Sequence, residues 1–174
     1  RAKEYEAEKL CIDYARRGMF EILIARPFNH IGPGQSERFA IANFCRQSVL
    51  IQRKQLKPIF LVGNIDTTRD FTDVRDICRA YKLLLKNGEN SNIYNICSGK
   101  ERSIRSLLEL IVDLVDIDIR IQEDPSRFRD IDQKRIFGDN IKIKKEVGWT
   151  PVIEINETLS DIINFWQSDL SLNE

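Results

Sequence analysis

The segment FEILIARPFNHIGPGQ, residues 20–35, decides the fold class because an apolar run leads directly into a polar loop. FEILIA, residues 20–25, is short, apolar and rich in β-branched residues, which predicts a strand buried on both faces of a parallel sheet. In open α/β sheets, ligands bind beyond the carboxyl ends of such strands. Arg26, Asn29 and His30, the only histidine, are therefore candidate ligand contacts. In the structural alternative, Arg26 pairs with a carboxylate at the sheet edge and Asn29 caps a turn.

Outward from this segment, helical and strand patterns alternate along the whole chain. Thr72 and Ser103 are placed to cap the helices that follow them. We expect helices at 4–17, 37–54, 73–88, 103–115, 140–147 and 156–167, and further strands at 57–62, 92–97 and 117–122. This alternation predicts an α/β protein. Residues 124–137 are expected to form an irregular, charged loop.

The composition bounds the function. The 174 residues carry 27 basic and 27 acidic side chains, so the chain gives little reason to propose nucleic acid or an anionic membrane as partner. No apolar stretch approaches the roughly 20 residues of a membrane-spanning helix. Four scattered cysteines and a single histidine predict reduced, mostly buried thiols, no metal site and a cytoplasmic location. Because the chain begins at Arg1 without methionine, we expect a fragment.

The segment TTRDFTDVRD, residues 67–76, holds a second candidate site. Residues 64–70 are expected to form a polar loop, and Arg69 within it precedes a helix N-terminus, where a guanidinium beside free backbone N–H groups suits a phosphate. Alternatively, the three aspartates of the segment neutralise Arg69 and Arg75 and cap the helix; they are Asp70, Asp73 and Asp76.

Two further patterns carry less information on their own. In RFRDID, residues 127–132, Arg129 alternates with acidic side chains, a pattern that usually marks a solvated surface. Tyr5 and Lys9 stand at positions i and i+4, where an ammonium could lower the pKa of a phenol. Such pairs are common by chance on helix surfaces.

Taken together, ARPFNHIGPGQ, VGNIDTTRDFTDVRDICRAY, IYNICSG and GDNIKIKKEVGWTP resemble the C-terminal half of the extended short-chain dehydrogenase/reductases that act on nucleotide sugars. The HIGPGQ and RDFTDVRD forms are most similar to members that reduce a GDP-linked 4-keto-6-deoxyhexose. The resemblance implies an extended Rossmann-type fold, of which this chain holds the last parallel strands and a small α/β substrate-binding domain. Residues 1–35 would end the dinucleotide-binding domain, and 36–174 would be mainly substrate-binding, with 73–100 returning a helix and a strand to the Rossmann sheet.

The resemblance also assigns roles to individual residues. Asn29, Arg69 and Arg129 would contact the substrate diphosphate, although Asp130 stands where the family usually has proline. The cofactor neighbours would be Pro27, Phe28 and His30.

The family's catalytic lysine would fall at Lys3, with its tyrosine before Arg1. Tyr5 and Lys9 match the Tyr-x-x-x-Lys pattern literally, but using them would shorten the helix by more than one turn. We therefore interpret this second match as coincidence.

The implied activity is reduction of a sugar C4 ketone with NAD or NADP. No G-x-G-x-x-G occurs in the chain, so the phosphate-binding loop for the cofactor would lie outside it. A nucleotide-sugar epimerase or 4,6-dehydratase remains open, as does a non-catalytic fragment that binds a nucleotide sugar or assembles with a partner. The family is commonly dimeric through two helices per subunit, one of them at the start of this chain, so a homodimer is expected for the intact enzyme.

Overall fold

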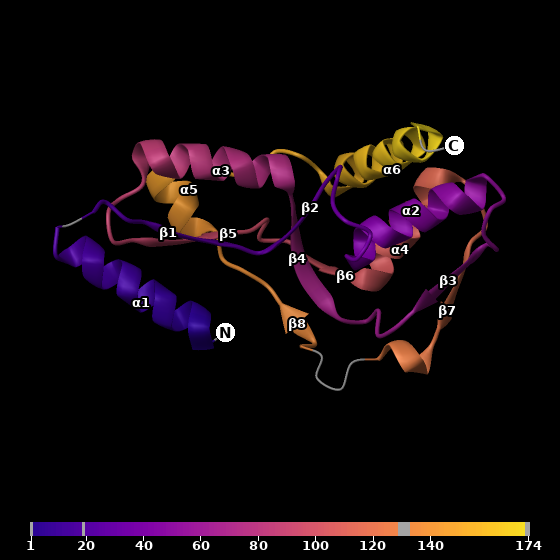
Figure 1. Ribbon diagram of the computed structural model, residues 1–174, viewed down its shortest axis with the longest axis horizontal. Coiled ribbons are helices and arrows are strands. Elements are labelled where there is room, and N and C mark those ends of the chain that lie inside the picture. Colours follow the sequence, from indigo (N-terminus) through magenta and orange to yellow (C-terminus); the bar gives the residue numbers. More distant parts are fainter. Residues whose placement is uncertain (1, 19, 129–132, 173–174) are drawn as a thin grey trace.

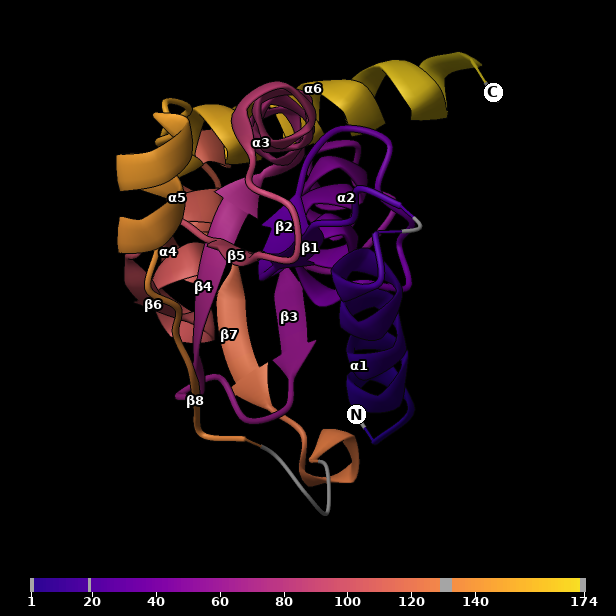
Figure 2. The same ribbon diagram turned by 90° about the vertical axis from the view of Figure 1, so that its left-hand side faces the viewer.

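The computed structural model describes residues 2–18, 20–128 and 133–172, and its elements gather into two groups (Figure 1). One end holds α3, α5, β1 and β5, and the other holds α2, α4 and α6 with β3 and β7. The long strand β4 runs between the two ends (Figures 1 and 2). The helices are α1 (Ala2–Arg16), α2 (Ala40–Gln52), α3 (Val74–Asn87), α4 (Ile104–Val115), α5 (Ile141–Val147) and α6 (Ile155–Leu172), with a 3₁₀ turn, η1 (Pro125–Arg127). The strands are β1 (Ile24–Pro27), β2 (Asn29–Ile31), β3 (Ile59–Val62), β4 (Thr68–Asp73), β5 (Ile93–Ile96), β6 (Glu101–Ser103), β7 (Arg120–Glu123) and β8 (Arg135–Ile136).

Most strand pairs are parallel, as the sequence predicts for an α/β protein. β1 pairs with β5, β2 with β4, β3 with β7 and β8 with β4, all in parallel, while β6 pairs antiparallel with β4. The chain leaves β1 at Pro27 and enters β2 at Asn29, so it changes partner from β5 to β4 within one residue. This change of partner places the RPFNHI segment between the two groups of elements.

Each group has its own hydrophobic core. The larger core lies among α2, α4, α6, β3 and residues of β4 and β7, and includes Phe60, Phe71 and Leu159. The smaller core lies among α3, α5, β1 and β5 around Tyr94 and Trp149. Thus β4 and α3, which follow each other in sequence, contribute to different cores.

Several boundaries differ from the sequence expectation. The first strand covers residues 24–27 and not 20–25, because pairing with β5 begins only at Ile24; Phe20 is exposed. The segment expected as a polar loop contains β4, and β2, β6 and β8 were not anticipated, since strands of two or three residues show no periodicity. The second helix begins at Ala40, and the last helix continues to Leu172.

The two predicted caps have different outcomes. Ser103 caps α4 by accepting a hydrogen bond from the Ser106 N–H, as expected. Thr72 was the wrong residue, because it lies in β4 opposite His30. Asp73 caps α3 instead, and its carboxylate accepts from the Arg75 N–H at 2.8 Å.

The cysteine expectation is half right. All four cysteines are free thiols, and Cys45 and Cys97 are buried, whereas Cys11 is half-buried and Cys78 is exposed on α3. Burial raises the pKa of the Cys45 and Cys97 thiols to about 12. Within the described residues, no helix has the length and apolar character needed to cross a membrane.

Candidate functional site

The pairing of β2 with β4 brings Asn29 and Arg69 close together, although they are far apart in sequence. Asn29 stands opposite Phe71, and Arg69 lies two residues before Phe71 on the same strand. Residues two apart on a strand share a face, so Asn29 and Arg69 start from the same face of neighbouring strands. The Asn29 side chain is exposed and Arg69 is half-buried. The Arg69 guanidinium donates from Nη1 to the carbonyl of Thr68 at 2.7 Å, which orients it along its own strand.

His30 lines a hollow of about 310 Å³ formed mainly by the GPG turn. The wall also includes Gln35, Phe39 and Val74. His30 Nδ1 lies 3.0 Å from the carbonyl oxygen of Phe28. A carbonyl oxygen can only accept, so Nδ1 carries the proton, and in the neutral ring Nε2 is left as an acceptor.

Gln35 is a candidate contact that the sequence argument passed over. Its Nε2 donates to the backbone carbonyl of His30 at 3.0 Å, which fixes the amide in the wall of the hollow. Its Oε1 is buried and has no hydrogen-bond partner among the described residues. A buried, unpaired acceptor favours a ligand that carries an N–H or O–H donor. The sequence shows only that a side-chain amide follows a rigid turn; the unpaired oxygen that marks Gln35 is a property of the folded turn.

Pro27 and Phe28 lie at the strand change and do not line the hollow of His30. Pro27 is paired with Ile96 of β5, and the Phe28 N–H donates to the Ile96 carbonyl at 2.9 Å. The Phe28 ring packs against Gly138, where a Cβ would lie 2.7 Å from the ring. Both residues therefore hold the segment in place, and their proximity to a cofactor stays a prediction.

Arg26 pairs with a carboxylate, as the structural alternative to ligand binding expected. It forms a bidentate ion pair with Glu8, with Nε to Oε1 at 2.7 Å and a second contact from Nη2 to Oε2. The carboxylate comes from α1 and not from the sheet edge. The hydrogen bond from Arg26 lowers the pKa of Glu8, and the same bond raises the pKa of Arg26. Arg26 is thus the link between α1 and β1.

The three aspartates of RDFTDVRD have separate partners. Asp73 pairs with Arg75 at 2.8 Å and accepts from the Thr158 hydroxyl of α6 at 2.8 Å. Burial by itself would raise the pKa of Asp73, but the hydrogen bonds from Arg75 and Thr158 outweigh it and lower the pKa. The structural alternative expected acidic side chains to neutralise Arg69 and Arg75. Arg75 is neutralised, because it forms ion pairs with both Asp73 and Asp161.

The other two aspartates bind backbone N–H groups. Asp70 accepts from the turn after β5, and Asp76 accepts from the segment before α6 and from Arg79. These carboxylates are structural ties, as the capping alternative partly foresaw.

Two predicted residues cannot be placed. The side chain of Lys3 and the whole of Arg129 lie outside the described residues. The loop before position 129 is anchored, because Arg127 pairs with Asp124 at 3.3 Å. A Cβ on Gly63 would come within 2.6 Å of the Arg127 carbonyl oxygen, so glycine allows the loop to approach the end of β3.

Tyr5 and Lys9 form a surface contact. The Lys9 ammonium lies 4.4 Å from the centre of the Tyr5 ring, over its face, and both side chains are exposed. Neither residue lines the hollow of His30. This geometry agrees with interpreting the pair as a coincidental match to the catalytic pattern.

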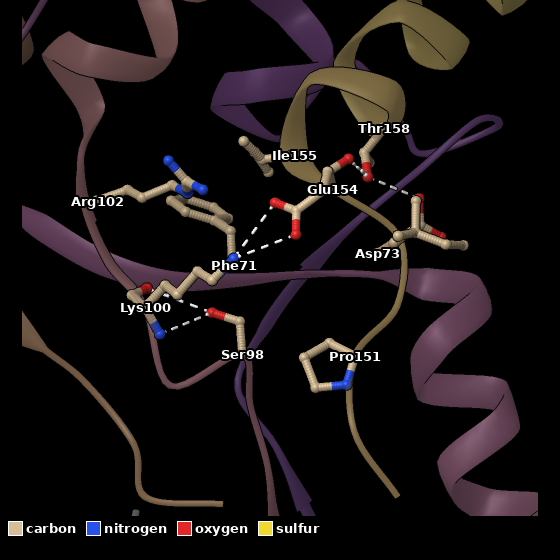
Figure 3. Close-up of a pocket in the computed structure, with 10 residues that line it drawn as sticks. Phe71, Asp73, Ser98, Lys100, Arg102, Pro151, Glu154, Ile155 and Thr158 are labelled. Carbon is tan, nitrogen blue, oxygen red and sulfur yellow. Dashed lines mark hydrogen bonds and ion pairs between the residues drawn. The ribbon is translucent and has the colours of Figure 1, made fainter.

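A second, smaller cavity of about 70 Å³ lies beside the start of α6, where Phe71 and Asp73 of β4 line it (Figure 3). Two of its charged groups, Lys100 and Glu154, pair with each other at 3.2 Å, and a third, Asp73, pairs with Arg75. In the part of the chain that is described, no group of three His, Cys, Asp or Glu residues could hold a metal ion.

Comparison with known proteins identifies the family. The family model for GDP-mannose 4,6 dehydratase matches residues 1–162. The chain belongs to this family. It is 41% identical over 162 residues to GDP-6-deoxy-D-mannose reductase of Pseudomonas aeruginosa, which covers 93% of the chain and 53% of that protein. It is 31% identical over 148 residues to GDP-6-deoxy-D-talose 4-dehydrogenase of Aggregatibacter actinomycetemcomitans, covering 83% of the chain and 48% of the relative.

Solved structures confirm the extended Rossmann-type fold. The structure of RMD from Pseudomonas aeruginosa complexed with NADPH superposes with a TM-score of 0.88 at 39% identity, covering 94% of this chain and 54% of that one. A putative epimerase from Burkholderia cenocepacia gives a TM-score of 0.81 at 32% identity, over 95% of this chain and 51% of that one. The chain therefore spans about half the length of the relatives it matches.

Proposed function

We propose that this member of the family contributes the C-terminal half of an NAD(P)-dependent reductase that acts on a GDP-linked 4-keto-6-deoxyhexose. The observation that carries the proposal is the β2–β4 pairing, which sets Asn29 and Arg69 on one face of neighbouring strands, while His30, the next residue of β2, lines the hollow. The relative with the highest identity quoted above is a GDP-6-deoxy-D-mannose reductase, and this supports the choice of nucleotide and reaction.

In this proposal, Asn29 and Arg69 hold the diphosphate of the nucleotide sugar. A guanidinium forms charge-assisted, bidentate hydrogen bonds with phosphate oxygens, and an asparagine amide can donate to a neighbouring oxygen. Holding the invariant diphosphate leaves the sugar free to be positioned for reaction. Arg129 is proposed as the second cationic contact.

The residues around His30 fit the nicotinamide end of the cofactor. The unpaired Oε1 of Gln35 can accept from a carboxamide N–H, and the wall of the hollow presents mostly apolar surface against which the nicotinamide ring can pack. When bound, NAD(P)H would supply the hydride for the C4 ketone. The proton for the new hydroxyl is assigned to a tyrosine upstream of this chain, with Lys3 as its lysine partner. A homodimer through the exposed face of α1 is part of the same proposal.

Calorimetry with GDP tests the diphosphate site directly. We expect Arg69→Ala to weaken GDP binding by roughly 10- to 100-fold, because hydrogen bonds to charged groups contribute about 1.5–3 kcal/mol. Arg17→Ala is the matched control, since Arg17 pairs with Asp13 on the surface of α1. Equal GDP affinity in wild type and Arg69→Ala would refute the assignment.

Turnover distinguishes the reductase from its alternatives. The chain alone is expected to show no NADPH oxidation with a GDP-4-keto-6-deoxyhexose, because it contains no glycine-rich dinucleotide loop. The same chain joined to the dinucleotide-binding half of a relative is expected to oxidise NADPH. NMR of the sugar product then separates reduction from epimerisation or dehydration. GDP binding without turnover by the joined enzyme would favour the non-catalytic alternative.

A further inference from the structure

Asp70 is a fully buried carboxylate directly after Arg69. Its side chain is 0% exposed and accepts three hydrogen bonds from the turn that follows β5. Oδ1 accepts from the Ser98 N–H and the Ser98 hydroxyl, both at 2.7 Å, and Oδ2 accepts from the Gly99 N–H at 2.9 Å. Leaving a carboxylate buried is costly unless such bonds satisfy it, so this contact is strongly specified.

The turn is shaped to hold a carboxylate. Gly99 has a φ of +72°, a conformation that glycine adopts without strain. Two successive N–H groups, those of Ser98 and Gly99, therefore point to one anion. The Ser98 hydroxyl also accepts a hydrogen bond from the Lys100 N–H and lies near the Lys100 carbonyl oxygen, so backbone groups orient it toward Asp70 (Figure 3).

The contact of Asp70 with the Ser98–Gly99 turn joins two strands that lead to the candidate diphosphate site. Asp70 lies on β4 immediately after Arg69, and its partners lie two and three residues beyond Ile96, the last residue of β5. The Ile96 carbonyl in turn accepts from the Phe28 N–H, and Phe28 is followed by Asn29. Asp70 thus connects the strand that carries Arg69 to the β1–β5 pair, which ends at Pro27, two residues before Asn29.

We propose that Asp70 is a positioning residue that fixes Arg69 relative to Asn29 at the diphosphate site. This inference rests on the proposed function, since it presumes that Arg69 and Asn29 bind the diphosphate together. Asp70 itself faces the Ser98–Gly99 turn and is fully buried, so it has no exposed surface for a ligand. Without its contact, β4 would still pair with β2, but the separation of the two binding residues would be less closely defined.

The chain offers a matched control in Asp76. Asp76 is also 0% exposed and also accepts from two successive backbone N–H groups, Val152 and Ile153, both at 2.9 Å. Its third donor is the Arg79 guanidinium at 2.6 Å. Its partners lie on α3 and in the segment before α6, and none of them belongs to β2, β4 or the turn that holds Asp70. Replacing either aspartate by asparagine disturbs a buried carboxylate held by two successive N–H groups, and at Asp76 it also removes the ion pair with Arg79, so Asp76→Asn is the more demanding control for stability.

Calorimetry with GDP and GMP on wild type, Asp70→Asn and Asp76→Asn tests the proposal, at a temperature where all three are folded. Displacing a binding group by about 1 Å costs roughly 10- to 100-fold in well-packed sites. We expect Asp70→Asn to raise the Kd for GDP at least tenfold more than Asp76→Asn does, and to affect GMP less than GDP. A merely structural role would lower the binding stoichiometry and leave the Kd of the folded fraction unchanged.

Each outcome has one meaning. Equal GDP affinity in Asp70→Asn and Asp76→Asn, while Arg69→Ala still weakens binding, would overturn the positioning role and leave the proposed function intact. Unchanged binding in Arg69→Ala would overturn both.

A milder pair of variants covers the case in which Asp70→Asn does not fold. Ser98→Ala removes one donor to Asp70, and Ser48→Ala removes a buried hydroxyl that donates to Cys45 within α2. Ser98→Ala is expected to raise the Kd for GDP about threefold relative to Ser48→Ala, a smaller loss because two donors remain. No difference between these two would also count against the proposal.

Discussion

Helices α1 and α6 have comparable lengths, yet the chain holds them in different ways. α6 buries Ile155, Leu159, Ile162, Ile163 and Trp166 in the larger core. α1 leaves Tyr5, Leu10 and Tyr14 exposed and is linked to β1 by the ion pair of Glu8 with Arg26. An amphipathic pattern therefore predicts a helix, but it does not say whether its partner surface is available within the same chain.

The largest expected difference between the two helices is in the free energy of unfolding that is lost when an apolar side chain is truncated. Leu159 is 0% exposed and Leu10 is 57% exposed. We expect Leu159→Ala to lower the free energy of unfolding by about 2–5 kcal/mol, because it removes buried surface and leaves a cavity. Leu10→Ala should change it by no more than about 0.5 kcal/mol. Urea unfolding followed by circular dichroism measures both, and similar losses would show that α1 is as well packed as α6.

An intermediate effect is expected where α6 is tied to the β4–α3 junction. Asp73 has a lowered pKa in the folded protein, so its stabilisation is present at neutral pH and is lost as the pH falls through that folded-state pKa, below the ordinary value of 3.8. Asp73→Asn should cost about 1–3 kcal/mol at pH 7. The difference from wild type should stay constant down to about pH 5 and shrink below about pH 4.

The control for this pH dependence is Asp118→Asn, on an exposed carboxylate. It should leave the pH profile of unfolding close to that of wild type. A gap between wild type and Asp73→Asn that widens on acidification would contradict the assigned sign.

The smallest effect is expected at the link between α1 and β1. Arg26 is 45% exposed, so solvent screens its pair with Glu8, and Arg26→Gln should cost at most about 1 kcal/mol. Hydrogen exchange should nevertheless change selectively, with faster exchange of α1 amides and unchanged exchange in α6. Uniformly faster exchange across both helices would mean that α1 is not an independent unit.

The sequence predicted the periodic parts of the fold well and the short strands poorly. The amphipathic helix from Val74 and the cap at Ser103 are encoded within a few neighbouring residues, so pattern alone identified them. β2 and β8 span three and two residues, and their existence depends on pairing with β4. The same pairing buries the polar segment of β4, which hydropathy assigned to a loop.

The candidate site divides in a similar way. The resemblance selected Asn29, Arg69 and His30, and the structure places the first two on adjacent strands and the third in the wall of the hollow. Gln35 was missed because an unpaired buried oxygen is visible only after the turn is folded. Arg26 was a candidate ligand contact until the structure showed Glu8 beside it.

The sequence by itself determined the α/β class, the family and the residue types available for a diphosphate, because these depend on local periodicity and on motifs within single segments. The tertiary structure decided which of the charged residues serve as structural ties, as Asp70, Asp73 and Asp76 do, and that His30 and Gln35 line one hollow. The physical reason is that a buried carboxylate loses its hydrogen bonds to water. Hydrogen bonds from segments distant in sequence replace them, and the carboxylate then holds those segments together. Those segments are brought together only by folding.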